Sequence, residues 1–183
     1  MIRALAAAWL AAASLAAAPA GAQGFPYEQF APDTLARFAA RIEMFSTTPS
    51  AEERVVLLGR ITKLRVQATY VGEHRPVDEI TAGIILRYAQ RATDDPEGYA
   101  GLYREFYAFD DGGRRYWLPV QHQVAASFEG ELKPGQRIEL YALAVGGLAA
   151  PNQKLQPLLL VQEFGTEKLD EDPPLGPRPA PAD

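Results

Sequence analysis

The spacing of hydrophobic residues changes along the chain, and its first clear pattern is helical. Between residues 33 and 46 the apolar positions recur three or four residues apart, as on one face of a helix; they are Leu35, Phe38, Ala39, Ile42 and Phe45. We therefore predict one amphipathic helix over residues 33–46, with Asp33 as its N-cap. The segment before it, residues 24–32, contains three aromatic side chains that we expect to pack on the domain.

After this helix the hydrophobic period becomes two. Apolar and polar residues alternate from Arg60 to Tyr70, which predicts a half-buried strand followed by a turn at residues 72–76. Residues 137–145 alternate in the same way and predict a strand that ends at Gly146-Gly147. The apolar run over residues 158–164 predicts the last strand of the domain.

A hairpin is predicted between these strands. Residues 102–109 and 114–120 are rich in aromatic and apolar side chains and flank Asp110-Asp111-Gly112-Gly113, so we expect Asp111-Gly112 to be the turn. This register predicts that one face carries Arg104, Phe106, Arg115 and Trp117, and that the other carries Tyr107, Phe109, Arg114 and Tyr116.

Two segments are ambiguous. Residues 80–91 are interpreted as a strand, although a helix also fits because alternation is weak there. Residues 121–130 fit a short helix or a loop. With connections too short for helical crossovers, the sequence predicts a mainly β fold, a small antiparallel barrel of five or six strands preceded by one amphipathic helix.

The phrase from Leu132 to Tyr141 places a glycine turn directly before an alternating strand. Together with the strand spacing over residues 54–164, it resembles the oligonucleotide/oligosaccharide-binding (OB) barrel. The resemblance implies a five-stranded Greek-key barrel. It does not imply a function, because one fold carries many functions.

The two ends of the chain differ from this domain. Residues 1–22 combine Arg3, an apolar stretch and Ala20-Gly21-Ala22, which predicts a signal peptide cleaved before Gln23 and a periplasmic or secreted product. Cleavage before Gly21 and an uncleaved membrane anchor are the alternatives; no later run is long enough to span a membrane. Residues 23–53 form an N-terminal segment, 54–165 the barrel, and 166–183 an acidic, proline-rich tail expected to be disordered.

Composition narrows the choice of partners and chemistry. The chain has 18 Lys and Arg against 23 Asp and Glu, a net charge of −5, which argues against a nucleic-acid partner. It has no cysteine, which excludes a disulfide and a thiolate nucleophile. Neither histidine, His74 or His122, has a metal-ligand partner at a typical spacing, and no glycine-rich phosphate loop is present, so we expect no metal and no cofactor.

Arginine and aromatic residues are concentrated on the hairpin, a composition typical of interaction surfaces. We predict a binding surface made of Arg104, Tyr107, Arg115, Tyr116 and Trp117, with Lys63 and Arg65 on the neighbouring strand. Alternatively, one hairpin face is core and the other is a solvated face with arginines.

The leading hypothesis is an exported, non-enzymatic binding or adaptor domain that holds a protein or an anionic envelope ligand. The alternatives are a cell-envelope enzyme that uses His122 with Asp110 or Asp111, and a structural subunit of an envelope complex. The sequence leaves the ligand, the oligomeric state and the buried face of the hairpin open.

Overall fold

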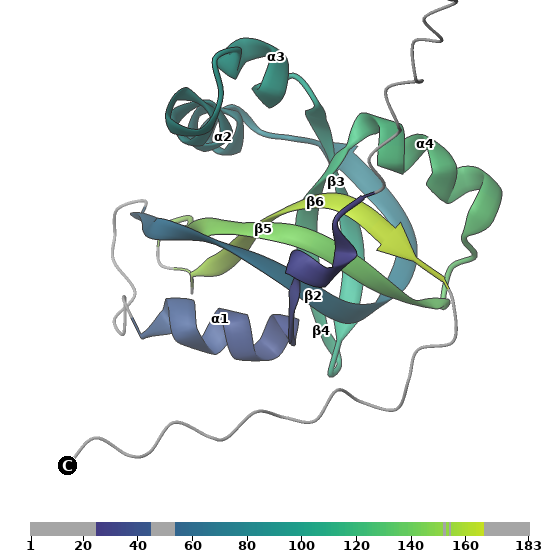
Figure 1. Ribbon diagram of the computed structural model, residues 1–183. Coiled ribbons are helices and arrows are strands. Elements are labelled where there is room, and N and C mark those ends of the chain that lie inside the picture. Colours follow the sequence, from purple (N-terminus) through teal and green to yellow (C-terminus); the bar gives the residue numbers. More distant parts are fainter. Residues whose placement is uncertain (1–24, 45–53, 152, 154, 167–183) are drawn as a thin grey trace, which may run out of the picture.

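The computed structural model contains both strands and helices. It describes residues 25–44, 54–151, 153 and 155–166. In chain order the elements are the 3-10 helix η1 (Tyr27–Gln29), β1 (Ala31–Asp33), α1 (Leu35–Glu43), β2 (Arg54–Pro76), α2 (Glu79–Ala92), α3 (Pro96–Ala100), β3 (Tyr103–Asp111), β4 (Arg114–Gln121), α4 (His122–Glu131), β5 (Arg137–Ala149) and β6 (Gln156–Gly165) (Figure 1). The predicted signal peptide and acidic tail lie outside the described residues, apart from Thr166.

Five of the strands close into a barrel. The sheet order is β1-β2-β3-β4-β6-β5, and β2 also pairs with β5, which joins the two ends. β1 is an additional short strand that runs parallel to β2, and β4 meets β6 in parallel at Val120 and Val161; the remaining pairs are antiparallel. The mainly β, OB-like fold predicted from the sequence is confirmed, with a mixed rather than an antiparallel sheet.

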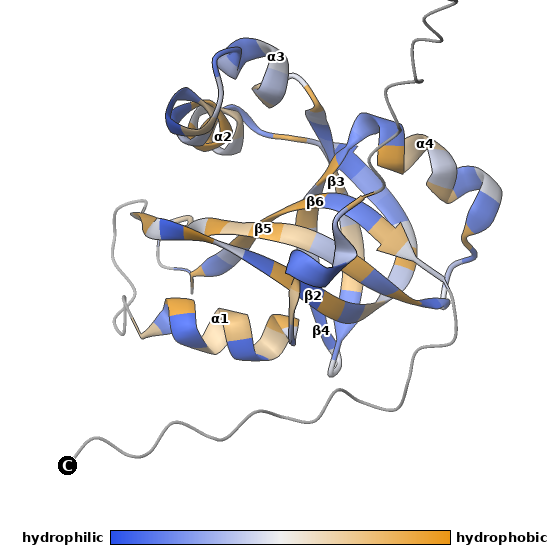
Figure 2. Cartoon of the chain, viewed as in Figure 1, coloured by the Kyte–Doolittle hydropathy of each residue, from blue (hydrophilic) through white to orange (hydrophobic). Residues whose placement is uncertain are grey.

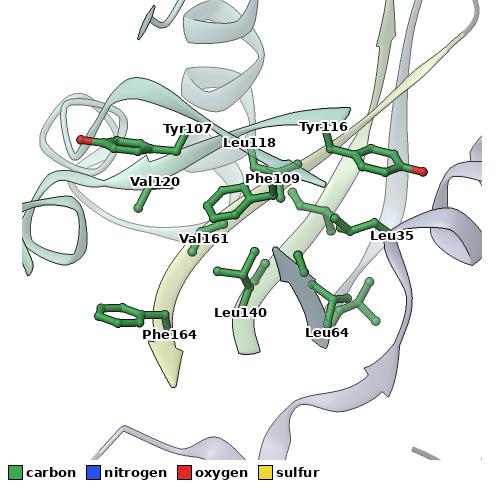
Figure 3. Close-up of a cluster of buried hydrophobic side chains, with 14 of the residues drawn as sticks. Leu35, Leu64, Tyr107, Phe109, Tyr116, Leu118, Val120, Leu140, Val161 and Phe164 are labelled. Carbon is green, nitrogen blue, oxygen red and sulfur yellow. The ribbon is translucent and has the colours of Figure 1, made fainter. Parts of the chain in front are cut away.

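Helices α1 and α4 cover the two ends of the barrel interior (Figure 1). The buried face of α1 consists of the predicted apolar positions Leu35, Phe38, Ala39 and Ile42. At the other end the Phe128 ring of α4 makes edge contacts with Tyr107 and Phe164, with ring centroids 5.1 and 5.0 Å apart. Between the two ends, Phe109, Leu118, Leu140 and Val161 fill the core (Figure 3).

The hairpin tip holds α1 at both of its ends. Asp111 Oδ2 accepts a hydrogen bond from the Ala36 N–H in the first turn of α1, with a donor–acceptor distance of 3.1 Å. Arg114, which faces Asp111 across the hairpin, lies 3.4 Å from the Glu43 carboxylate at the last residue of α1. The acidic turn therefore has a structural role in seating this helix.

β5 is buried on both faces, and it is hydrophobic along most of its length (Figure 2). Its outer residues Tyr141, Leu143 and Val145 belong to a second apolar cluster, which α2, α3 and the entry segment cover. The rings of Phe25 and Phe30 contact the edge of Tyr141, with centroids 5.8 and 5.5 Å away. The predicted packing of the entry aromatics is thus confirmed.

The interpretation of residues 80–91 as a strand is wrong, because this segment is the helix α2. Asp78 caps it by accepting a hydrogen bond from the Thr81 N–H at 2.7 Å. Its buried residues Thr81, Ile84, Ile85 and Ala89 follow helical spacing. Residues 121–130, for which the sequence allows a short helix or a loop, are helical from His122 onward and form most of α4.

The N-cap of α1 also differs from the prediction. Thr34, not Asp33, caps the helix by accepting a hydrogen bond from the Arg37 N–H at 3.0 Å. Asp33 ends β1 and lies 2.6 Å from the guanidinium of Arg41. The helix begins at Leu35 and the structure describes it to Glu43; Phe45 and Ser46 lie outside the described residues.

The predicted hairpin is confirmed with a different turn. Asp111 pairs with Arg114, so the two turn residues are Gly112 and Gly113, with φ values of 59° and 80°. Positive φ at both central residues is the conformation of a type I′ turn, which glycine adopts without a steric penalty. The pairing moves by two residues relative to the prediction, so the side chains from Phe106 to Trp117 stay on their predicted faces. Arg104 does not, because the register shifts between Tyr103 and Glu105, and Arg104 borders a pocket with Tyr107 instead of Phe106.

Gly146 and Gly147 do not end the strand, since β5 continues to Ala149. A Cβ atom at Gly146 would overlap the carbonyl oxygen of Val56 on β2, and one at Gly147 would lie 2.5 Å from Ile42 Cγ2 on α1. These glycines permit β5 to pass very close to β2 and α1.

We therefore predict that Gly146→Ala lowers the free energy of unfolding by about 3 kcal/mol, the upper part of the range for overpacked sites. The clash is with backbone, which a rotamer change cannot relieve. Urea unfolding measures the effect. Gly59→Ala is the matched control on β2, because a Cβ there meets open space; equal stability of the two variants would contradict the close-approach argument.

Candidate functional site

A pocket of about 360 Å³ opens beside the hairpin. Three parts of the chain surround it: the outer face of β2, β3 and β4, the start of α2, and the connection from β5 to β6. The lining residues are Arg75, Asp78, Thr81, Phe106, Arg115, Tyr116, Trp117, Leu148, Ala150, Gln153, Gln156, Pro157 and Leu158. We name it the hairpin pocket.

Arg75 lies over two aromatic rings in this pocket. Its guanidinium carbon is 4.7 Å from the centroid of Trp117 and 5.2 Å from that of Phe106. Arg75 pairs with Phe106 across β2 and β3, so its side chain extends over β3 to reach Trp117 on β4. Phe106 is buried, Trp117 is half-buried and Arg75 is exposed, which leaves a cation and part of an indole facing solvent.

The second arginine of the pocket is neutralised by acidic neighbours. Arg115 Nη1 lies 2.9 Å from both carboxylate oxygens of Glu73, and its Nε lies 3.3 Å from Asp110. Arg75 has no carboxylate within 4 Å among the described residues. Asp78, the acidic residue of the lining, caps α2 with Oδ1. Among the described residues, Arg75 is thus the cation of the lining that has no ion-pair partner, and the capping Asp78 carboxylate contributes one negative charge to the same lining.

Sequence reasoning missed Arg75. It placed residues 72–76 in a turn, whereas β2 continues to Pro76 after an irregularity between Tyr70 and His74. Gly72, at a φ of 87°, marks this irregularity. Residues 72–76 are all polar, glycine or proline and all exposed, so no apolar alternation in the sequence marks the continuing strand.

The residues predicted as one binding surface are distributed over three places. Arg115 and Trp117 line the hairpin pocket; Tyr116 also lines it, but its ring is buried in the barrel. Arg104 and Tyr107 border a different pocket. Lys63 and Arg65 lie on the outer face of β2 where it pairs with β5, near Gln29 and Glu139 respectively. The site is therefore built from Arg75, Phe106, Arg115 and Trp117.

A second pocket, of about 510 Å³, lies between β3 and α4 and includes His122. Tyr107 donates a hydrogen bond to Glu105 at 3.1 Å, and His74 stacks on the Tyr107 ring and lies 3.3 Å from Glu105. Burial, together with the Glu105 carboxylate, raises the pKa of Tyr107 to about 12.

This pocket does not unite the residues of the enzyme hypothesis. His122 follows the end of β4, whereas Asp110 and Asp111 lie at the hairpin tip, beyond the opposite end of that strand. Asp110 contacts Arg115, and Asp111 contacts α1. The structure therefore does not bring His122 together with either aspartate.

A cluster of tyrosines fastens α2 and α3 to the barrel. The hydroxyls of Tyr99 and Tyr103 are 3.4 Å apart, and Gln121 Nε2 donates to Tyr103 at 3.1 Å. The Tyr88 ring lies 5.8 Å from that of Tyr99. Burial is the main cause that raises the pKa of all three tyrosines above the ordinary value of 10. The neutral form of this cluster thus holds α3 and α2, and the start of α2 lines the hairpin pocket.

The raised pKa values predict a loss of stability in alkali. Because the folded state keeps these protons more tightly than the unfolded chain, their contribution is fully present below pH 10 and declines as the pH rises above it. Urea unfolding at pH 8 and pH 11 measures this decline, which Tyr99→Phe should reduce by removing one ionisable group. An unchanged decline in the variant would show that Tyr99 is not responsible.

Comparison of the chain with models of protein families gave no match, and comparison with curated proteins found no similar sequence. Among the helices that the structure describes, none combines the length and apolar character needed to cross a membrane.

Proposed function

We propose that this protein is an exported, non-enzymatic binding or adaptor domain that holds an anionic group of its partner in the hairpin pocket. The observation that carries this proposal is the position of Arg75, which lies 4.7 Å from the Trp117 ring and has no acidic partner among the described residues. A guanidinium placed between aromatic rings and solvent is suited to a carboxylate or a similar anion.

The other lining residues are mostly apolar, so we expect the anionic group of the ligand to be attached to an apolar group. Phe106, Trp117, Leu148, Pro157 and Leu158 supply apolar surface beside Arg75. A volume of about 360 Å³ is within the range of pockets that hold small ligands or single side chains. The favoured ligand therefore combines one negative charge with a flat or aliphatic group.

The charged groups around the pocket support binding rather than catalysis. Glu73 and Asp110 are ion-paired with Arg115, and Asp78 caps α2. These described carboxylates have structural partners, and Arg75 acts through its charge.

The proposal of export rests on the sequence of residues 1–22, where Arg3, the apolar stretch and Ala20-Gly21-Ala22 have the order of a signal peptide. We expect expression in a bacterial host to yield a chain that starts at Gln23 in the periplasmic fraction. N-terminal sequencing and mass determination measure this, and a full-length chain confined to the cytoplasm would contradict the proposal.

The binding role is tested with small carboxylates and their neutral amides. We expect benzoate, indole-3-acetate or hexanoate to shift the NMR signal of the Trp117 indole N–H, and the matching amide to shift it much less. Arg75→Gln should weaken carboxylate binding at least about tenfold, because a charge-assisted hydrogen bond contributes about 1.5–3 kcal/mol.

Arg60→Gln serves as the control, since Arg60 is exposed and does not line the pocket. Trp117→Phe should keep the fold and reduce the affinity. Equal affinity for carboxylates and amides, or equal effects of the Arg75 and Arg60 substitutions, would contradict the proposed role of this pocket.

A further inference from the structure

The strand β4 has an unpaired edge beside the hairpin pocket. It pairs with β3 along its whole length, from Arg114 to Gln121. On its other side, the described residues form a single pairing with β6, between Val120 and Val161. Among the described residues, 114–119 of β4 therefore have no strand partner on this side, although β4 and β6 come close together where they meet at Val120 and Val161.

The hairpin turn determines which backbone groups point to this edge. A two-residue turn makes Asp111 and Arg114 a hydrogen-bonded pair, and such pairs recur at every second residue. Tyr116 consequently directs its N–H and C=O to β3, whereas Arg115 and Trp117 direct theirs away from β3. The backbone of Pro119 also points away from β3. Proline has no N–H to donate, which fits a position on the edge of a sheet.

The unpaired edge and the hairpin pocket coincide. Arg115 and Trp117 on β4 and Gln156, Pro157 and Leu158 on β6 all line the pocket. An edge of free N–H and C=O groups at strand spacing is complementary to another extended backbone, which is the basis of β-strand addition. A glycan has no matching repeat of backbone donors and acceptors.

We propose that the partner is an extended peptide segment with an acidic side chain, which adds to the free edge of β4 and places its carboxylate against Arg75. This inference rests on the proposed function. A strand added to β4 lies about 4.8 Å from it. On the outer face, a side chain of that strand is a neighbour of Trp117, over which the Arg75 guanidinium already lies.

The proline-rich part of this chain's own tail is a poor candidate for the segment. All five prolines of residues 167–183 lie in residues 173–181, and proline cannot donate a hydrogen bond to a ladder. We therefore propose a segment of another protein, and occupation of the edge by residues 167–172 is an outcome of the exchange experiment on the full chain.

The edge itself is tested by amide hydrogen exchange in the full chain. The amides of Arg115 and Trp117 should exchange at least tenfold faster than those of Tyr116 and Leu118, because only the latter bond to β3. Equal protection at all four positions would show that the edge is occupied within the molecule and would overturn the inference.

The partner is tested with a displayed library of random eight-residue peptides selected on the full chain. We expect enriched peptides to alternate in hydrophobicity and to carry Asp or Glu at one fixed position. A selected peptide should protect the Arg115 and Trp117 amides, and an oligogalacturonate should not. Methylating the edge-facing amides of the peptide should weaken binding at least tenfold, while methylating the alternate amides should change it less than threefold.

Arg75→Gln should abolish the preference for the acidic residue, and Arg60→Gln should retain it. Failure of the selection, equal effects of the two methylation patterns, or protection by oligogalacturonate would overturn peptide addition. If small carboxylates still bind through Arg75 in that case, the proposed function stands and only the peptide inference fails. If they do not bind either, both are wrong.

Discussion

The double pairing of β2 is the constraint on which the structure depends. Its 23 residues pair first with β5 and then with β3, so one strand closes the barrel. The change of partner occurs at Thr69, which pairs with both Arg137 of β5 and Asp110 of β3, and the close passage of β5 requires Gly146. The same path carries β2 beyond the barrel wall, where Arg75 lies over the two rings of the hairpin. The strand β2 thus both closes the barrel and carries Arg75 to the hairpin pocket.

The burial of β5 on both faces explains why helices lie outside the barrel. Its outer side chains need a cover, which α2, α3 and the entry aromatics provide. The cover begins at Asp78, immediately after β2 ends, so the start of α2 borders the hairpin pocket. The tyrosine cluster fixes this arrangement. The helix α2, which covers the outer side chains of β5, therefore also forms one wall of the hairpin pocket.

Local patterns predicted the first helix, the hairpin and the strand alternation, because each depends on neighbours in sequence. The strand interpretation of residues 80–91 is wrong because Ile84 and Ile85 fit a strand as well as a helix, and the Asp78 cap that favours the helix lies before the segment. Gly146 does not end a strand, because glycine there permits the close approach of β5 to β2. The binding residues were only partly identifiable: Trp117 and Arg115 follow from the hairpin, but Arg75 joins them, and Lys63 and Arg65 leave them, through long-range pairing of β2 that no local pattern encodes.

The contacts of the hairpin tip link two parts of the molecule that differ in character. Asp111 and Arg114 hold the first and last turns of α1, and α1 closes one end of the core. Both residues belong to the hairpin whose outer face carries Arg115 and the Trp117 indole. One anchor point of α1 is thus the last residue of β3 and the other is the first residue of β4. The hairpin that lines the pocket therefore also seats the helix that closes this end of the barrel, so a substitution at its tip would affect the packing of α1 as well as the hairpin.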